Sequence, residues 1–373
     1  MNSFTKTATG KLASVEHALD RLKLKLKAKF GNFEPIRILP FRGFGNRERI
    51  WLRGRVLEDS GLTGLDEDTN KLDNLMNMWR RYESDEIPGA KLELQFGDLV
   101  VPMTTDDEGY FDISVDLPAS ISVDSPWIEV DIVLLDSIAD HQYPIRRKGL
   151  VLIPPEDAEF GVISDIDDTI VKTGATHFLR HLSTVLLNNA VSREPFTGVA
   201  PFYRALQKGP DGKGSNPIFY VSSSPWNIYD LLEDFMDIHD IPLGPIQLKD
   251  MGLDADKFIK AGHETYKVEC IERIIATYPK LPFLLIGDSG QRDAYVYQQV
   301  VRKYPNRILA VYLRDLKPNQ HNADFDAIEH ELAKLGVPML LAEDSLAAAR
   351  HAVDQGWLTR AALTEIEQTV EST

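Results

Sequence analysis

The stretch 160–173, F-G-V-I-S-D-I-D-D-T-I-V-K-T, constrains the fold of this chain more than any other feature. An apolar run that begins after Pro154 and Pro155 leads to Asp165, and a second aspartate follows at Asp167. This pattern predicts a short buried strand that ends at the aspartates. Side chains two positions apart on a strand point the same way, so both carboxylates are expected at the carboxyl edge of a sheet, where open α/β folds bind ligands. The alternative is a surface turn with scattered acidic residues.

Two adjacent carboxylates repel each other, so such a pair needs a cation or a proton nearby. Mg²⁺ is a hard ion that prefers carboxylate oxygens as ligands. The sequence therefore predicts a Mg²⁺ site beside Asp165 and Asp167.

From about residue 158 onward, apolar strands alternate with helical segments, which is typical of a parallel sheet in an α/β fold. The predicted strands are 160–164, 217–221, 245–248, 282–286 and 307–313. The predicted helices are 177–190, 199–208, 226–237, 266–277, 291–303, 322–336, 344–355 and 359–370.

Two later strands of this domain also end in reactive side chains. The run I-F-Y-V-S-S-S-P-W-N places Ser222 just past a strand, where its hydroxyl could hold a phosphate oxygen or could cap the next helix. The run L-L-I-G-D-S-G-Q-R-D ends another strand at Asp288, with Gly287 before it and Asp293 after it. Glycine permits close backbone approach, and Asp288 is placed to complete a metal site with Asp165.

Lys267 lies in the first turn of a predicted helix, where the helix dipole disfavours a cation. This misfit indicates a counter-charge for phosphate. A solvated surface lysine is the alternative.

The segment 35–135 predicts several short strands separated by turns, which is typical of an antiparallel sandwich. The expected strands lie within 35–58, 91–96, 99–103, 110–117 and 127–135, with one helix over 72–84. This segment shows no cluster of metal-ligating residue types, so we interpret it as a binding or structural module.

The N-terminal residues 11–30 predict a basic amphipathic helix, because leucines recur at spacings of three and four among many lysines. Such a helix could contact an anionic lipid surface or pack on the next domain. The net charge of the whole chain is −16, so we expect no nucleic-acid partner. One cysteine, Cys270, and no hydrophobic signal core suit a cytoplasmic location, with peripheral membrane association left open.

Together, these motifs resemble the haloacid dehalogenase superfamily of phosphotransferases. The matching features are D-x-D-x-T at 165–169, Ser222, Lys267 and G-D-x-x-x-x-D at 287–293. Within that superfamily, the chain is most similar to the actin-patch phosphatidate phosphatase family and its bacterial relatives. The lipin phosphatidate phosphatases are similar but usually carry glycine where this chain has Asp168.

The resemblance implies a domain order for the whole chain. A Rossmann-like parallel-sheet hydrolase domain with a small cap is expected over 156–373. A β-rich, sandwich-like accessory domain precedes it over 33–155, and the basic helix covers 1–32.

The resemblance also implies roles for the residues of the site. The expected catalytic residues are Asp165 as nucleophile, Asp167 as general acid and base, and Ser222 and Lys267 as groups that hold the phosphoryl group. The expected ligands of Mg²⁺ are Asp165, Asp288 and the backbone carbonyl of Asp167, with Asp293 supporting them. Thr169, Ser223 and Trp226 are expected on the substrate side, although Trp226 could equally be packing at a helix start.

These expectations predict a Mg²⁺-dependent phosphatidate phosphatase that forms diacylglycerol and phosphate through an aspartyl-phosphate. One alternative is a phosphatase for another phosphomonoester. The other is a non-catalytic lipid-binding protein whose hydrolase domain is vestigial.

Overall fold

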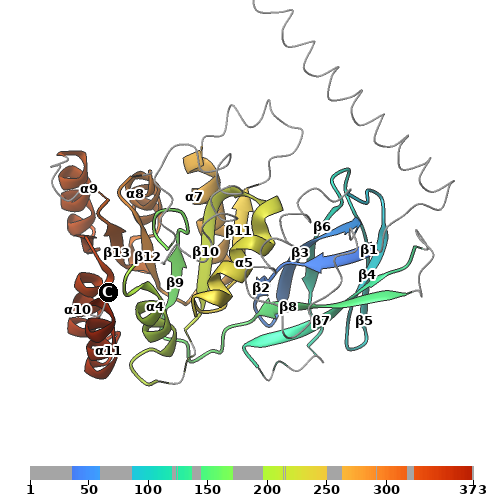
Figure 1. The fold of residues 1–373 in the computed structure, drawn as a ribbon, viewed down its shortest axis with the longest axis horizontal. Helices are drawn as coiled ribbons and strands as arrows, with labels where there is room; N and C mark the ends of the chain where they lie inside the picture. Colours follow the sequence, from blue (N-terminus) through green and yellow to red (C-terminus); the bar gives the residue numbers. More distant parts are fainter. Residues whose placement is uncertain are drawn as a thin grey trace, which may run out of the picture.

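The computed structural model describes two sheets that lie side by side (Figure 1). The described residues are 36–58, 86–119, 123, 125–136, 144–170, 196–212, 214, 216–249, 263–290, 292–316 and 323–371. The predicted helices over 1–32, 72–84 and 177–190 lie outside the described residues, as does the segment in which a cap was expected.

The N-terminal sheet has eight strands in the order β1-β3-β2-β8-β7-β4-β5, with β6 paired to β3. The strands are β1 (Ile36–Pro40), β2 (Gly43–Gly45), β3 (Arg49–Glu58), β4 (Lys91–Phe96), β5 (Leu99–Thr104), β6 (Tyr110–Asp116), β7 (Trp127–Leu134) and β8 (Ile145–Leu152). The sequence did not predict β8, because three exposed cations in succession, Arg146 to Lys148, break its apolar alternation.

The expectation of an antiparallel sandwich is only partly met, because all eight strands belong to one mixed sheet. Strands β2 and β8 run parallel, whereas the other pairings are antiparallel. Strand β5 also contacts β6, so the sheet folds back on itself. It encloses a core of apolar side chains such as Leu52, Leu94 and Ile132.

The second sheet has six parallel strands in the order β11-β10-β9-β12-β13-β14. The strands are β9 (Gly161–Ser164), β10 (Ile218–Pro225), β11 (Ile246–Lys249), β12 (Phe283–Asp288), β13 (Ile308–Arg314) and β14 (Met339–Ala342). The first five match predicted strands, whereas the short edge strand β14 was not predicted. The strand order reverses between β9 and β12, which is where doubly wound sheets bind their ligands.

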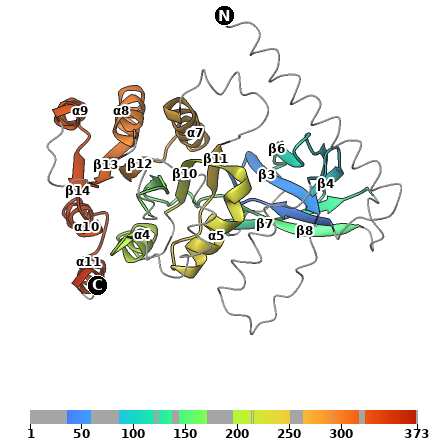
Figure 2. The same ribbon diagram turned by 45° about the horizontal axis from the view of Figure 1, so that its top comes forward.

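Helices cover both faces of this sheet (Figure 2). They are α4 (Val199–Lys208), α5 (Tyr229–Ile238), α7 (His263–Thr277), α8 (Asp293–Lys303), α9 (Ala323–Lys334), α10 (Ser345–Asp354) and α11 (Arg360–Glu371). Short 3₁₀ turns η1 (Trp226–Ile228) and η2 (Pro305–Arg307) precede α5 and β13. No helix among the described residues is long and apolar enough to cross a membrane.

The period-2 alternation of the strands separates two apolar cores. Val162 packs with α4, α5, α10 and α11, whereas its neighbour Ile163 packs with α7, α8 and α9. Each core also includes a residue of the N-terminal part, Phe41 from the link between β1 and β2 in the first and Phe44 of β2 in the second. The two sheets are therefore joined by continuous apolar packing.

Candidate active site

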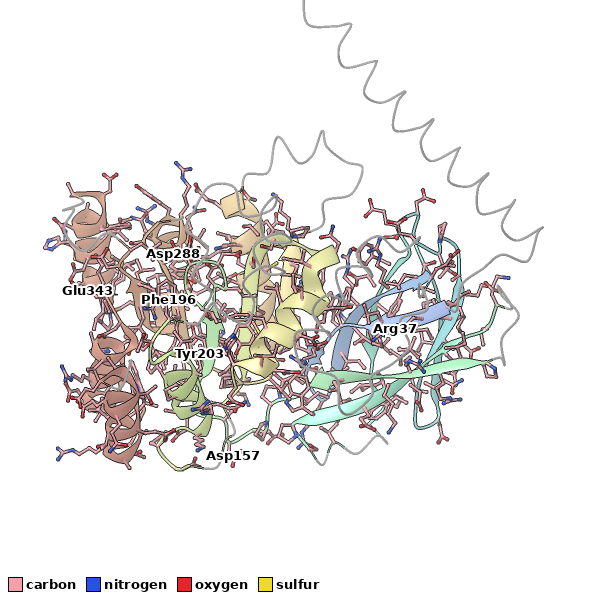
Figure 3. The ribbon with its side chains drawn as sticks, viewed as in Figure 1. Arg37, Asp157, Phe196, Tyr203, Asp288 and Glu343 are labelled. Atoms are coloured by element: carbon pink, nitrogen blue, oxygen red, sulfur yellow. The ribbon has the colours of Figure 1, made fainter. Side chains whose placement is uncertain are left out.

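The candidate site lies at the carboxyl ends of β9 and β12, next to the point where the strand order reverses. Asp165 directly follows β9, and its N–H donates to the carbonyl of Ile286 at 2.9 Å. Asp288 is the last residue of β12, beside β9 in the sheet. Figure 3 shows Asp288 at one end of the sheet and Asp157, in the linker before β9, at the opposite end.

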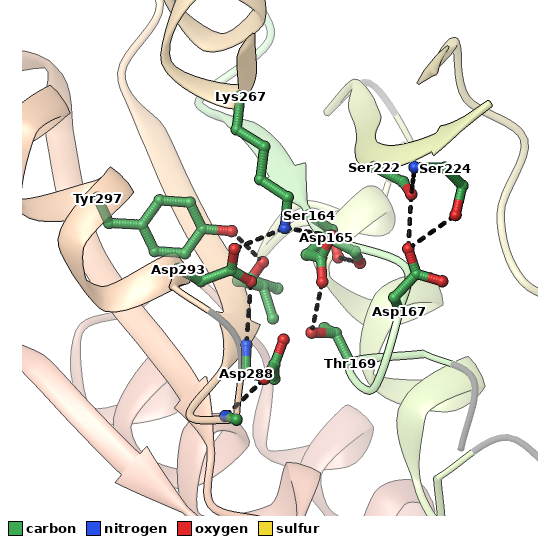
Figure 4. Close-up of polar contacts among 12 residues, drawn as sticks. Ser164, Asp165, Asp167, Thr169, Ser222, Ser224, Lys267, Asp288, Asp293 and Tyr297 are labelled. Carbon is green, nitrogen blue, oxygen red and sulfur yellow. Dashed lines mark hydrogen bonds and ion pairs between the residues drawn. The ribbon is translucent and has the colours of Figure 1, made fainter. Parts of the chain in front are cut away.

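A buried lysine joins two of the carboxylates (Figure 4). Lys267 Nζ lies 2.8 Å from Asp165 Oδ1 and 2.6 Å from Asp293 Oδ1. Burial disfavours the charged form of Lys267, but the two carboxylates outweigh this effect and raise its pKa. Lys267 therefore remains an ammonium group, in contrast to the solvated alternative.

Asp293 is held against β12 by a close backbone approach. Its Oδ2 accepts a hydrogen bond of 3.3 Å from the N–H of Asp288. A methyl group at Gly287 would lie 2.5 Å from that same oxygen. Glycine is therefore required where Asp293 approaches the strand.

Three carboxylates form a cluster of metal-binding type. One oxygen each of Asp165, Asp288 and Asp293 lies within 4.8 Å of the others, and all three residues are buried. The pKa of Asp165 lies well above its ordinary value because of burial and the charge of Asp293, although Lys267 acts in the opposite direction. When all three are ionised, the carboxylates carry more negative charge than the single ammonium group of Lys267 offsets.

Asp167 faces a different set of partners from Asp165. Its Oδ2 accepts hydrogen bonds from Ser222 Oγ at 2.6 Å and from Ser224 Oγ at 3.1 Å. Burial raises the pKa of Asp167, and the two hydroxyl donors partly oppose this rise. The two aspartates therefore lie in distinct environments, and such a contrast allows one residue type to take two roles in a site.

The loop after Asp167 has a strained backbone. Asp168 has a φ of 56°, a left-handed conformation that aspartate tolerates better than most residues but that glycine adopts freely. Thr169 Oγ1 then lies 3.5 Å from Asp165 Oδ2, so the turn brings Thr169 back to Asp165.

The structure brings most predicted site residues together. They are Asp165, Asp167, Thr169, Ser222, Lys267, Asp288 and Asp293. Trp226 instead packs against the N-terminal sheet and is only 5% exposed, which favours its packing alternative. The buried Ser223 Oγ makes no hydrogen bond to any described residue, and its role on the substrate side stays a prediction.

Sequence reasoning missed several supporting hydroxyls. Ser224 donates to Asp167, and strand alternation from Ser222 could have revealed it. Tyr203 Oη lies 2.7 Å from Ser164 Oγ, which donates to the carbonyl of Asp165. Tyr297 donates to the carbonyl of Ile286 at 2.6 Å. The two tyrosines come from α4 and α8, and nothing in their local sequence marks them as site residues.

Comparison with known proteins shows which family the segment that carries this site resembles. Residues 160–315 match the model of the phosphatidate phosphatase APP1 catalytic domain. The predicted resemblance is confirmed over this segment. Phosphatidate phosphatase APP1 of Saccharomyces cerevisiae is 35% identical over 154 residues, which cover 41% of this chain and 25% of that protein. An uncharacterized protein of Schizosaccharomyces pombe is 24% identical over 237 residues, which cover 63% of this chain and 37% of that protein.

The chain thus spans well under half the length of these curated relatives. Solved structures are only distantly similar. A carbohydrate acetylesterase from Xanthomonas citri is 10% identical, with a TM-score of 0.28 over 80% of this chain and 65% of that chain. Ferredoxin-NADP+ reductase from Plasmodium falciparum is 8% identical, with a TM-score of 0.18 over 73% of this chain and 94% of that chain. Scores this low carry no argument about function.

Proposed function

We propose that this protein is a Mg²⁺-dependent phosphatase that hydrolyses phosphatidate to diacylglycerol and phosphate. The observation that carries the proposal is the contrast between the two aspartates of the D-x-D pair. Asp165 contacts an ammonium group, whereas Asp167 contacts two hydroxyls. This separation suits a nucleophile beside a general acid and base. The similarity to phosphatidate phosphatase APP1 supports the substrate class.

The carboxylate cluster fits a hard divalent cation. It consists of buried oxygens of Asp165, Asp288 and Asp293, and Lys267 offsets only part of their charge. Both oxygens of Asp293 already accept hydrogen bonds, from Lys267 and from the N–H of Asp288. We therefore assign Asp165, Asp288 and the backbone carbonyl of Asp167 as ligands, with Asp293 orienting them. A bound Mg²⁺ would offset charge on the phosphoryl oxygens.

The chain's own residues account for each proton and bond. An oxygen of Asp165 attacks phosphorus, and the bond between phosphorus and the glycerol oxygen breaks as Asp167 donates its proton to that oxygen. Asp167 then accepts a proton from water as the water oxygen attacks phosphorus, which releases phosphate and restores Asp165. Lys267 and Ser222 hold the transferring group in both steps.

Phosphate release from phosphatidate in mixed micelles tests this proposal. Wild type should release phosphate only with Mg²⁺, and Asp165→Asn should lower the rate by at least ~10³-fold, because the nucleophile is lost. Asp157→Asn is the matched control, since Asp157 is exposed and lies at the other end of the sheet. A panel of soluble phosphomonoesters runs in parallel.

Each outcome has a distinct meaning. Activity on soluble esters alone would keep the mechanism and reject phosphatidate as substrate. Full activity in Asp165→Asn would reject the nucleophile. A folded wild type that acts on none of these esters would support the alternative of a lipid-binding protein.

A further inference from the structure

The serine turn of the site, Ser222 to Ser224, lies in an irregular part of β10. Val221 pairs with Gln247 and Pro225 pairs with Lys249, so three residues of β10 lie opposite a single residue of β11. Such a bulge re-aims side chains but removes the regular ladder that would hold them. The serine hydroxyls reach Asp167 from this bulge. Their position therefore depends on what holds the chain on either side.

On the far side of the bulge, the chain is held by the N-terminal sheet. The ring of Trp226 stacks on Phe41 with centroids 5.1 Å apart and planes 8° apart. The guanidinium of Arg53 lies 4.9 Å from the Trp226 ring centroid. Phe41 also stacks on Tyr229 at 4.2 Å, and the backbone N–H of Arg42 donates to Tyr229 Oη at 2.7 Å. The N-terminal sheet thus contacts both η1 and the first turn of α5.

The link from Trp226 back to the serines is short and stiff. Only Pro225 separates Trp226 from Ser224, and the proline ring restricts the backbone there, with φ at −76°. A displacement of the Trp226 backbone would therefore displace Ser224 by a similar amount. Ser224 N–H also donates to Ser222 Oγ at 2.9 Å, so both serines would move together.

We propose that Trp226 is a positioning residue and that the N-terminal sheet, through Phe41 and Arg53, holds the serine turn against Asp167. This inference rests on the proposed function and assigns a task to the N-terminal sheet. Trp226 does not touch the reacting atoms. It acts through Ser222 and Ser224, whose hydroxyls orient the general acid.

The same sheet contacts a second element of the site. The guanidinium of Arg273 lies 4.6 Å from the Trp51 ring centroid and also donates to Gln247 of β11. Arg273 belongs to α7, the helix that carries Lys267. The N-terminal sheet therefore supports the elements that supply both phosphate-holding groups.

Four single variants of the full chain test the proposal. Trp226→Leu removes the stacked ring, Trp226→Phe keeps a ring, and Phe41→Leu removes the contact from the side of the N-terminal sheet. Trp357→Leu is the matched control, because Trp357 packs on the same apolar core but contacts His351, away from the serine turn. The rate of backbone hydrogen exchange in a peptide covering 219–226 measures how firmly the serine turn is held. The kcat and KM for phosphatidate measure the effect of the turn's position on catalysis and on substrate binding.

We expect exchange at the turn to accelerate by about tenfold in Trp226→Leu and in Phe41→Leu. The kcat should fall by about tenfold or more with KM within threefold, since misplaced catalytic groups lower kcat. Trp226→Phe should retain most of the wild-type protection from exchange and most of the wild-type kcat. Trp357→Leu should leave the exchange rate at the turn and the kcat within twofold of wild type.

The proposal fails if Trp226→Phe is as impaired as Trp226→Leu, or if exchange at the turn does not change. It also fails if Trp226→Leu lowers only the melting temperature while the folded enzyme keeps its kcat. An inactive wild type would instead reject the proposed function, and the exchange data would still decide whether Trp226 positions the turn.

Discussion

Two buried cations of this protein each lie between two carboxylates, and they differ in what surrounds them. In the site, Lys267 contacts Asp165 and Asp293 at 2.8 and 2.6 Å, and all three side chains are at most 6% exposed. Between the two sheets, Arg42 contacts Glu233 at 3.0 Å and Asp237 at 3.7 Å. There the two carboxylates are 30% and 54% exposed.

The difference shows that the energetic cost of losing a charged partner increases with the burial of the pair. A charge removed from water needs its partners, because the protein interior screens it poorly. A carboxylate that retains contact with water can lose its partner at a small cost. We therefore expect the site charges to be tightly interdependent and the interface charges to be replaceable.

The largest expected effect comes from Lys267→Met. Removal of the ammonium group leaves the buried Asp165 and Asp293 facing each other, which should lower the free energy of unfolding by about 3–5 kcal/mol without metal. Urea unfolding in the presence of EDTA measures this change. Lys303→Met is the control, because Lys303 pairs with Glu272 at the surface. Equal, small losses in both variants would contradict the comparison.

The next effect concerns Mg²⁺. An ion that binds the folded chain alone should stabilise it by about 2.7 kcal/mol at a hundredfold excess over its dissociation constant. Calorimetric melting with Mg²⁺ and with EDTA measures the shift, which should be largely lost in Asp288→Asn because a neutral amide replaces the charged carboxylate ligand. If Asp288→Asn gains as much stability from Mg²⁺ as wild type does, the assigned ligands are wrong.

A smaller loss is expected for Arg42→Met at the interface. The methionine keeps much of the apolar contact, and both carboxylates can be solvated, so the free energy of unfolding should fall by about 1 kcal/mol. Arg47→Met provides the control, since Arg47 pairs only with the exposed Glu156 among the described residues. A loss as large as that of Lys267→Met would remove the distinction between the two regions.

An effect of similar size, spread over a range of pH, is a pH dependence of the interface. Burial and neighbouring acidic residues raise the pKa of Glu233 to about 7, although Arg42 opposes the rise. Its pKa in the folded chain is therefore above its pKa in the unfolded chain. Folding then favours the protonated form, and wild type should lose stability as the pH rises from about 4.5 to about 7.

Glu233→Gln cannot titrate and should lack this loss. The stability of wild type relative to Glu233→Gln should fall by about 1 kcal/mol across that window, with the effect reduced because Glu233 is 30% exposed. Urea unfolding at a series of pH values measures the difference. A difference that is constant with pH, or that grows with pH, would contradict the raised pKa.

Much of the α/β part could be predicted because its signals are local. The helix over 199–208 was predicted with the bounds that the structure shows for α4, since its apolar spacing and the following Gly209 are both in the sequence. Five of the parallel strands were predicted for the same reason. The edge strand β14 was missed because M-L-L-A is too short for a periodic signal.

The N-terminal part was harder to predict, because pairing between distant strands decides its form. Strand β8 reads as a charged segment, yet it pairs with β7 along its whole length. The parallel pairing of β2 with β8, which joins residues about a hundred positions apart, has no local signature. The sequence therefore predicted strands here but not the single mixed sheet.

By itself, the sequence determined which residue types gather at the carboxyl edge of the parallel sheet. Two apolar strands end at Asp165 and at Asp288, and strand alternation points Ser222 and Ser224 the same way. Only the tertiary structure decided which groups contact each carboxylate. Lys267 contacts Asp165 and Asp293, and the two serines donate hydrogen bonds to Asp167. It also decided that Trp226 is buried against Phe41 of the N-terminal sheet. The physical reason is that chain direction and period are local properties, whereas burial and charge pairing depend on residues far apart in the sequence.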